Sequence, residues 1–284
     1  MKKILKALAA AALLLTVAAC SNIALKDAIN KELGITTTRL GSIADRRSGG
    51  YGYTLDGYYM ESVRSKLLNP ANFGPGGTSK KPIVITDIAG TVDSKVLERL
   101  DVLMVGRIPN GTLSPGELSA IKSWVQSGGV VVTCPEFDSY NGFYSDDVAA
   151  AFGYPLYSGI LDPYYGPGWE LPAASGLPLF TGPFGDVSTT SAGHLQAGDY
   201  SDAGLLGTAA GLTVLSRDDG RVWDPDPSLM APSIALRDYG KGKLILLMTV
   251  DFISDDSLYV YLDDVIDPSY SDEVFLGNLF AYVH

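Results

Sequence analysis

Short apolar runs alternate with segments of helical spacing along most of the chain after about residue 38. The apolar runs predict strands at 39–44, 82–88, 101–106, 130–134, 212–216, 233–237 and 243–251. The helical spacing predicts helices at 59–68, 94–100, 114–127 and 272–283, the last with its apolar residues near one face. Uniformly apolar strands separated by helices are typical of a mainly parallel sheet covered on both faces, so we expect an α/β fold.

The middle of the chain does not follow this rhythm. Residues 138–210 are rich in Gly, Pro, Tyr and Ser, and only 146–152 has clear helical character. We interpret this segment as an irregular insertion. A structureless stretch of that length is uncommon in a compact domain, so we expect short strands within it.

The N-terminus has the pattern of an export signal. Lys2, Lys3 and Lys6 precede an uncharged run over 7–19, which is too short to span a bilayer comfortably. The end of this run resembles the bacterial lipobox, in which the cysteine after the cut carries the lipid. We therefore expect 1–19 to be a lipoprotein signal peptide and Cys20 to carry acyl chains. An ordinary signal peptide or a short N-terminal anchor is the other interpretation.

This interpretation predicts a bacterial cell-envelope protein that is held to a membrane through Cys20. Residues 20–37 would be a tether or a short helix, followed by one domain over 38–284. By resemblance to enterobacterial lipoproteins, Ser21 permits transport to the outer membrane if the source is Gram-negative.

The composition excludes several classes of function. The chain has 21 Lys and Arg against 32 Asp and Glu, a formal net charge of −11, whereas a nucleic-acid-binding protein normally presents a basic face. Two cysteines rule out a disulfide framework and a cysteine-rich zinc site. Two histidines restrict any mechanism that needs imidazole.

Several segments resemble the class I glutamine amidotransferase-like superfamily, over about 38–284. They are the strand DVLMVG, the helix that ends in W-V-x-x-G-G, the strand VVVTC, and the late segments GKGKLILLMTVDF and SDEVFLGNLFAYV. The patterns NPANFGPGGT and GPFGDV are also similar to exported bacterial members. The resemblance implies a flavodoxin-like three-layer sandwich.

The same resemblance places a catalytic nucleophile at Cys134, but the neighbouring residues oppose it. Pro135 has no N–H for an oxyanion hole and favours extended backbone at the residue before it. The glycines of a nucleophile elbow would fall at Val132 and Glu136. The late strand ends near Asp251, where the family would place its histidine. We therefore predict no catalytic residues and a non-catalytic binding or structural module.

Open parallel sheets bind ligands beyond the carboxyl ends of their strands. Our strands place a polar set at that edge: Asp45, Arg46, Arg107, Cys134, Glu136, Asp138, Asp251, Asp255 and Asp256. We interpret this set as a site for a carbohydrate or another small polar ligand. Nearby aromatic residues would form an adjacent wall: Phe137, Tyr140, Phe143, Tyr144, Tyr164, Tyr165 and Trp169. The alternative is that these acids cap helices and the tyrosines are ordinary surface residues.

Two further hypotheses remain open. A carboxylate-dependent hydrolase of envelope or extracellular polysaccharide could use Asp45, Glu136 or Asp251, provided that two of them lie at catalytic separation. The acidic stretch 251–272 offers carboxylates of the kind that calcium binds, although its spacing does not match an EF-hand and a solvated acidic loop would look the same. The chain has no nucleotide-binding or zinc-peptidase motif, so we predict no other cofactor.

Overall fold

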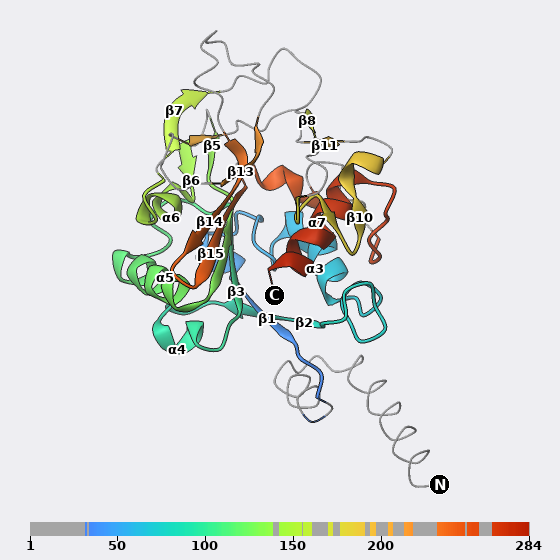
Figure 1. Ribbon diagram of the computed structural model, residues 1–284. Coiled ribbons are helices and arrows are strands. Elements are labelled where there is room, and N and C mark those ends of the chain that lie inside the picture. The colour runs from blue at the N-terminus through green and yellow to red at the C-terminus, as the bar shows by residue number, and fades with distance from the viewer. Residues whose placement is uncertain are drawn as a thin grey trace.

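The structure is a computed structural model of the whole chain (Figure 1). It describes residues 32, 34–138, 142–154, 156–160, 170–172, 177–190, 194–196, 204–206, 213–217, 232–247, 249–255 and 263–283. The predicted signal peptide, Cys20 and most of the tether lie outside the described residues. Among the helices of the described part, none is long and apolar enough to cross a membrane.

A seven-stranded sheet forms the centre of the fold, in the order β13-β14-β15-β4-β3-β1-β2. Its strands are β1 (Thr38–Ile43), β2 (Ile83–Ile88), β3 (Val102–Gly106), β4 (Val130–Thr133), β13 (Thr213–Arg217), β14 (Pro232–Tyr239) and β15 (Gly242–Leu247). The five strands from β2 to β15 are mutually parallel, whereas β14 and β13 add an antiparallel edge. The predicted α/β class with a mainly parallel sheet is therefore confirmed.

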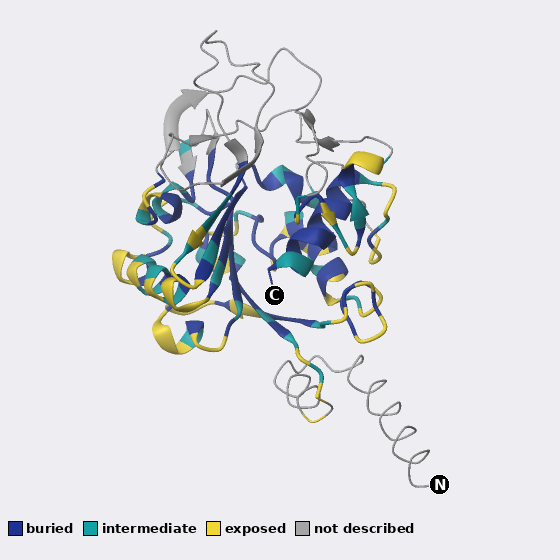
Figure 2. Cartoon of the chain, viewed as in Figure 1, coloured by how far each residue is buried: buried dark blue, intermediate teal, exposed yellow. Residues whose placement is uncertain are grey.

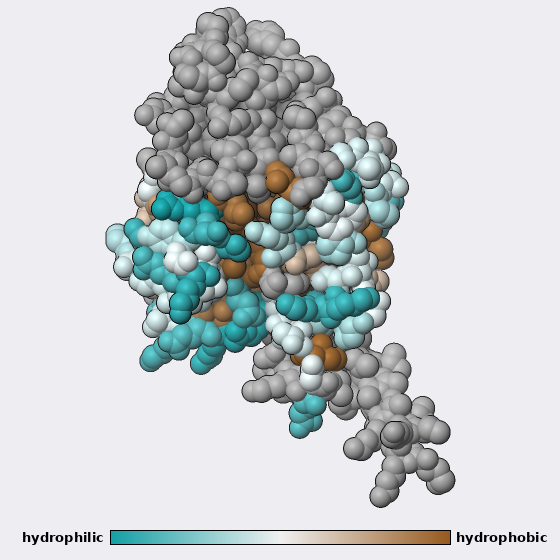
Figure 3. All heavy atoms as spheres, viewed as in Figure 1, coloured by the Kyte–Doolittle hydropathy of each residue, from teal (hydrophilic) through white to brown (hydrophobic). Residues whose placement is uncertain are grey.

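Helices cover both faces of this sheet (Figure 1). One face packs against α3 (Glu61–Leu68) and α7 (Ser271–Tyr282), and the other against α4 (Ser94–Leu97), α5 (Pro115–Ser127) and α6 (Asp146–Ala151). The strands carry apolar residues toward both layers. In β3, for example, Met104 belongs to the core beneath α7 and Leu103 to the core beneath α5. Figure 2 shows the resulting buried sheet, and the outer surface of α4 and α5 is exposed and hydrophilic (Figure 3).

Local sequence signals explain where several elements begin and end. Ser114 accepts a hydrogen bond from the Glu117 N–H, and the Glu117 carboxylate accepts one from the Ser114 N–H, which completes the predicted capping box of α5. Asp93 caps α4 through the Val96 N–H. The predicted strand over 243–251 is shorter in the structure, because β15 ends at Leu247 and a 3-10 helix, η6 (Val250–Phe252), follows.

The C-terminal helix differs from its prediction. We expected α7 to be amphipathic, but every residue from Ser271 to Phe280 is buried. Its polar side chains find partners inside the fold. Asn278 accepts a hydrogen bond from the Phe184 N–H at 3.1 Å and donates one to the Gly185 carbonyl at 3.0 Å. The helix is therefore covered all round, with its polar groups satisfied internally.

The segment 138–210 contains the expected short strands. Antiparallel pairs join β5 (Glu136–Asp138) to β6 (Gly142–Tyr144), β7 (Leu156–Ile160) to β12 (Gly204–Leu206), β8 (Glu170–Pro172) to β11 (His194–Gln196), and β9 (Thr181–Gly182) to β10 (Gly185–Asp186). Besides η6, the described part of the chain has short 3-10 helices at η1 (Asp45–Arg47), η2 (Tyr58–Met60) and η4 (Val187–Thr189), the last of which follows β10.

Candidate functional site

The carboxyl-end edge of the sheet holds a buried ion pair. Arg107 directly follows β3, and Glu136 opens β5 just after β4. The Arg107 Nε lies 3.2 Å from Glu136 Oε1, with 9% and 4% of the two side chains exposed. The other oxygen of Glu136 accepts a hydrogen bond from the Val250 N–H at 3.2 Å. The structure thus brings together two of the predicted site residues and ties them to the end of β15.

Three tyrosines surround the Arg107 guanidinium. Its central carbon lies 5.3, 5.0 and 4.4 Å from the ring centres of Tyr51, Tyr53 and Tyr144. The Tyr51 and Tyr144 hydroxyls share a hydrogen bond of 2.6 Å. Aromatic faces attract a cation, most strongly when water is excluded. We call this set, with Glu136, the arginine cage.

The charge of the arginine cage is internally balanced. Burial lowers the pKa of Arg107, but Glu136 and then the tyrosines outweigh burial and raise the pKa above its ordinary value. The guanidinium therefore stays positive opposite the Glu136 carboxylate. The two charges therefore compensate each other among aromatic rings, at the edge where ligands bind in other open sheets.

Cys134 lies beneath this cage and is fully buried. Burial raises the pKa of its thiol well above the ordinary value, and the nearby Glu136 and Asp251 raise it further, against a smaller opposing effect of Arg107. Its N–H donates to the Gly106 carbonyl at 3.2 Å. The only described non-glycine residue with positive φ is Ser145, so Cys134 does not have the strained backbone of a nucleophile elbow.

Asp45 stabilises the loop to which it belongs. Its Oδ1 accepts hydrogen bonds from the Gly52 N–H at 2.7 Å and the Ser48 hydroxyl at 3.2 Å. These contacts fold the chain between β1 and α3 back over the strand ends. Asp45 therefore helps to position the loop that carries Tyr51 and Tyr53.

Asp251 and Asp255 lie after the end of β15. Asp251 is half-buried in η6 and electrostatically close to Cys134. Asp255 accepts a hydrogen bond from the Ser62 N–H at 2.7 Å, in the first turn of α3. Burial raises the pKa of Asp255, and the backbone bonds at the helix start oppose that rise. Asp255 thus acts as a helix-capping acid, the structural alternative considered above.

The remaining predicted site residues are partly described. Arg46 lies in η1, and Asp138, Phe137 and Phe143 lie on β5 and β6, where only the backbone is described. The others fall outside the described residues: Tyr140, Asp256, Tyr164, Tyr165 and Trp169. Of the predicted aromatic wall, Tyr144 joins the arginine cage. Sequence reasoning missed Tyr51 and Tyr53, whose Tyr- and Gly-rich segment carries no periodicity that distinguishes a cage from a loop.

The acidic stretch is tied to the helices on the α3 side. Asp263 accepts a hydrogen bond from the Lys66 ammonium at 2.7 Å. Asp267 Oδ1 accepts one from the Ser269 N–H at 2.8 Å. Across the described ranges, no group of three or more His, Cys, Asp or Glu side chains is placed to hold a metal ion. The calcium hypothesis remains a prediction.

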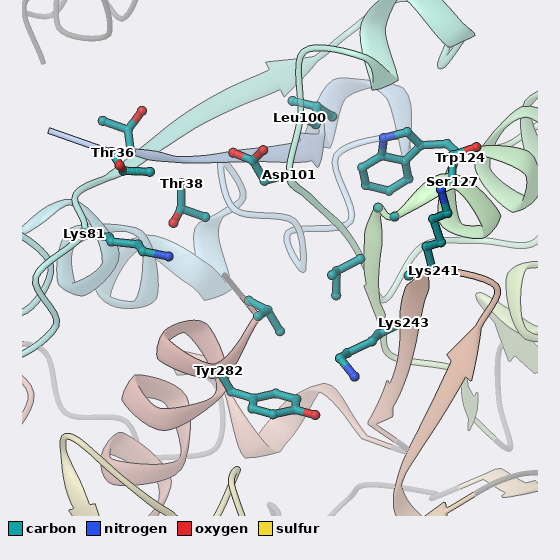
Figure 4. Close-up of a pocket in the computed structure, with 16 residues that line it drawn as sticks. Thr36, Thr38, Lys81, Leu100, Asp101, Trp124, Ser127, Lys241, Lys243 and Tyr282 are labelled. Carbon is teal, nitrogen blue, oxygen red and sulfur yellow. The ribbon is translucent and has the colours of Figure 1, made fainter. Parts of the chain in front are cut away.

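A pocket of about 570 Å³ lies at the opposite edge of the sheet, at the amino ends of the strands (Figure 4). We call it the amino-end pocket. Thr36 and Asp101 line one side, and Trp124, Lys243 and Tyr282 line the other. Its volume is within the range of small-ligand sites. Sequence reasoning missed it, because the usual rule directs attention to the carboxyl ends.

The W-V-x-x-G-G pattern shapes one wall of this pocket. A Cβ atom on Gly129 would lie 2.2 Å from the Trp124 ring, and one on Gly242 would lie 2.1 Å from the Gly129 carbonyl oxygen. The two glycines therefore let the end of α5, the start of β4 and the start of β15 approach each other closely. The pattern is a packing motif in this chain.

The fold recurs in solved structures of very different sequence. The mmIFT52 N-terminal domain aligns with a TM-score of 0.55 and 13% identity, over 87% of this chain and 97% of that domain. A putative ThuA-like protein from Bacteroides uniformis aligns at 0.50 and 13%, over 88% and 91% of the two chains. A cytoplasmic protein from Salmonella typhimurium aligns at 0.50 and 14%, over 87% and 98%.

These likenesses concern the fold. ThuA-like proteins have a class I glutamine amidotransferase-like fold, so the fold implied by the sequence resemblance is supported independently. No family model matches the chain, and no curated protein matches it. At 13–14% identity, residue roles cannot be transferred from these structures to this chain, so its function depends on the chemistry of its own site.

Proposed function

We propose that this chain is an exported lipoprotein, anchored to a bacterial envelope membrane through Cys20, whose amidotransferase-like domain binds or scaffolds rather than catalyses. The main support for a non-catalytic role is the state of Cys134. It is fully buried, its thiol pKa is raised, and its N–H is used by the Gly106 carbonyl. A thiol that is not ionised and cannot be reached is no nucleophile.

The arginine cage supports the same proposal. In catalytic members of this fold class, substrate must reach the edge above the strand ends. Here Arg107 and Glu136 lie at that edge and form an ion pair among three tyrosines. A substrate would have to displace a buried ion pair, which costs several kcal/mol when one partner is left uncompensated. The carboxyl-end edge is therefore better suited to holding loops together than to turnover.

The polysaccharide hydrolase is the weaker alternative. It needs two carboxylates that reach one glycosidic bond. Glu136 is 3% exposed, is ion-paired with Arg107 and accepts a hydrogen bond from the Val250 N–H. Asp45 accepts hydrogen bonds from the Ser48 hydroxyl and the Gly52 N–H of its own loop. Asp251, the third candidate acid, is half-buried. A carbohydrate ligand of the envelope stays part of the proposal as a binding partner, not as a substrate.

The export and anchoring part rests on the sequence of the first 20 residues. A basic start, an uncharged run and small residues before Cys20 together fit a lipoprotein signal. More than one acyl chain would hold the protein stably at a membrane, since each buried CH₂ contributes about 0.8 kcal/mol. The outer membrane is the proposed destination in a Gram-negative source.

Thiol counting tests both parts in one experiment. The full chain, purified from a bacterial host in detergent, is titrated with a chromogenic disulfide reagent in buffer and then in urea. We expect no reaction of the folded protein and one thiol per chain in urea, from Cys134. The Cys134→Ala variant should then show none in urea, because the Cys20 sulfur is acylated.

Other results would contradict specific parts of the proposal. One reactive thiol in denatured Cys134→Ala would mean that Cys20 is free, which removes the lipid anchor. Rapid reaction of folded wild-type protein, lost in Cys134→Ala, would mean an accessible thiolate. Ammonia release from glutamine that depends on Cys134 would establish catalysis and overturn the non-catalytic role.

A further inference from the structure

Basic residues surround the amino-end pocket. Lys81 precedes β2, and Lys241 and Lys243 flank the start of β15; all three line the pocket. Lys81 and Lys243 extend toward its middle from opposite walls (Figure 4). Lys243 is paired with the exposed Asp238 at 2.6 Å. Within the described part of the chain, the ammonium groups of Lys81 and Lys241 have no such partner.

In the described part of the chain, basic residues outnumber acidic ones around the amino ends of the parallel strands, although the chain as a whole is acidic and Arg39 there is paired with Asp101. Around the starts of the parallel strands the basic residues are Arg39, Lys80, Lys81, Arg99, Lys241 and Lys243, and the acidic ones are Glu98, Asp101 and Asp238. The opposite edge carries Asp45, Asp251 and Asp255 together with Arg46, while Glu136 there is balanced by Arg107. Charge is therefore separated along the strand direction, and such a separation orients a protein in an external field.

The chain enters the fold at this same end. Thr36, Thr37 and Thr38 line the pocket and lead into β1. The segment 20–36 is short, and it spans only about 55 Å even when fully extended. A lipid at Cys20 would thus hold the basic end of the domain, where the chain enters it, within about 55 Å of the bilayer.

We infer that the amino-end pocket faces the membrane and binds the phosphate of anionic phospholipid headgroups through Lys81, Lys241 and Lys243. This inference rests on the lipid anchor of the proposed function. An ammonium group is a compact point charge suited to phosphate. Trp124 and Tyr282 add aromatic rings of the kind that settle at membrane–water interfaces. A soluble phosphate ester shares this chemistry, so the test separates the two sources.

Trp124 supplies the readout, since it lines the pocket. Replacing the other two tryptophans (Trp169→Phe, Trp223→Phe) leaves Trp124 as the single fluorophore of the full-length, membrane-reconstituted protein. Vesicles contain a headgroup-spin-labelled lipid in phosphatidylcholine, with or without 30% phosphatidylglycerol. We expect stronger Trp124 quenching with phosphatidylglycerol, and loss of the difference at high salt, where charges are screened within a few ångströms.

A charge-matched pair of variants identifies the surface responsible. Lys81→Gln/Lys241→Gln should weaken docking roughly 30-fold, since each lysine near an anionic surface contributes about fivefold. Lys95→Gln/Lys122→Gln removes the same charge from α4 and α5 and should keep the quenching. Equal quenching in both lipid compositions, or an equal loss in both double variants, would overturn the inference.

Two further arms keep the outcomes distinct. Soluble glycerol phosphate is titrated by calorimetry; binding that depends on Lys81 and Lys241, without vesicle-dependent quenching, would assign the pocket to a free phosphate ester and overturn the membrane assignment. The mass of the N-terminal peptide reports acylation of Cys20. A peptide without acyl chains overturns the anchor and this inference together, whereas an acylated protein without quenching overturns the inference alone.

Discussion

The Lys66 ammonium lies 3.3 Å from Glu273 Oε1, and both side chains are completely buried. Lys66 comes from α3 and Glu273 from the first turn of α7, so the contact joins the two helices that cover one face of the sheet. Asp263 adds a second carboxylate at 2.7 Å, from the acidic stretch. The buried pair explains how polar residues are accommodated inside an otherwise apolar layer.

Removing Lys66 should be strongly destabilising. Lys66→Met leaves the Glu273 carboxylate buried without its cation, which typically costs about 3–5 kcal/mol of unfolding free energy. Urea denaturation followed by circular dichroism measures the loss. Lys66→Met/Glu273→Gln should recover part of it, because the amide keeps an acceptor for the Asp267 N–H without the charge. Exposed Lys95→Met is the control, expected within about 0.5 kcal/mol of wild type. An equal effect of Lys66→Met and Lys95→Met would contradict the buried pair.

Glu117 should make stability depend on pH. Burial raises the pKa of Glu117, but hydrogen bonds from the Val92 and Ser114 N–H groups, the Ser114 hydroxyl and Arg47 lower it to about 2, from an ordinary 4.5. A depressed pKa stabilises the fold above the unfolded-state value, and that stability is lost as the pH falls from about 4.5 toward 2.

Glu117→Gln tests this linkage. The variant should lose on the order of 2 kcal/mol at pH 7 and show a flatter decline in stability between pH 4.5 and 2 than wild type. Urea midpoints measured across that range give the curve. Glu98→Gln changes an exposed carboxylate and should follow the wild-type curve. The assignment of the acid transition to Glu117 fails if Glu117→Gln and wild type decline in parallel.

Gly242 should be more sensitive to substitution than Gly129. A Cβ on Gly242 meets the backbone oxygens of Gly129 and Val125 at 2.1 and 2.2 Å, and backbone cannot move aside as a side chain can. Gly242→Ala should therefore cost about 2 kcal/mol or more. Gly129→Ala meets the Trp124 ring and should cost less while shifting Trp124 fluorescence.

Gly90→Ala is the matched control for these two variants. Nothing lies within 4 Å of the added methyl group at Gly90. Its stability should stay near that of wild type, within about 0.5 kcal/mol. Thermal unfolding of the three variants gives the order. A loss for Gly90→Ala as large as that for Gly242→Ala would show that the close approach of the strand ends is not the cause.

The order and type of the main elements follow from local pattern alone. Short apolar runs such as 101–106, bounded by turn residues, are typical of strands buried on both faces, and Ser114 with Glu117 places the start of α5 through bonds between near neighbours. These signals act over a few residues, so they are readable without the fold. The missing amide of Pro135 is equally local, and it already argued against a nucleophile at Cys134.

Only the tertiary structure decided which distant residues meet. The arginine cage joins Tyr51, Arg107 and Tyr144, which are far apart in the chain and share no periodic pattern. The all-round burial of α7 depends on Lys66 and on the 184–185 backbone arriving to satisfy Glu273 and Asn278. A polar residue in a sequence predicts exposure unless a partner is brought to it, and that partner is supplied by long-range packing. The amino-end pocket arises in the same way, where the starts of the parallel strands and the ends of α5 and α7 come together.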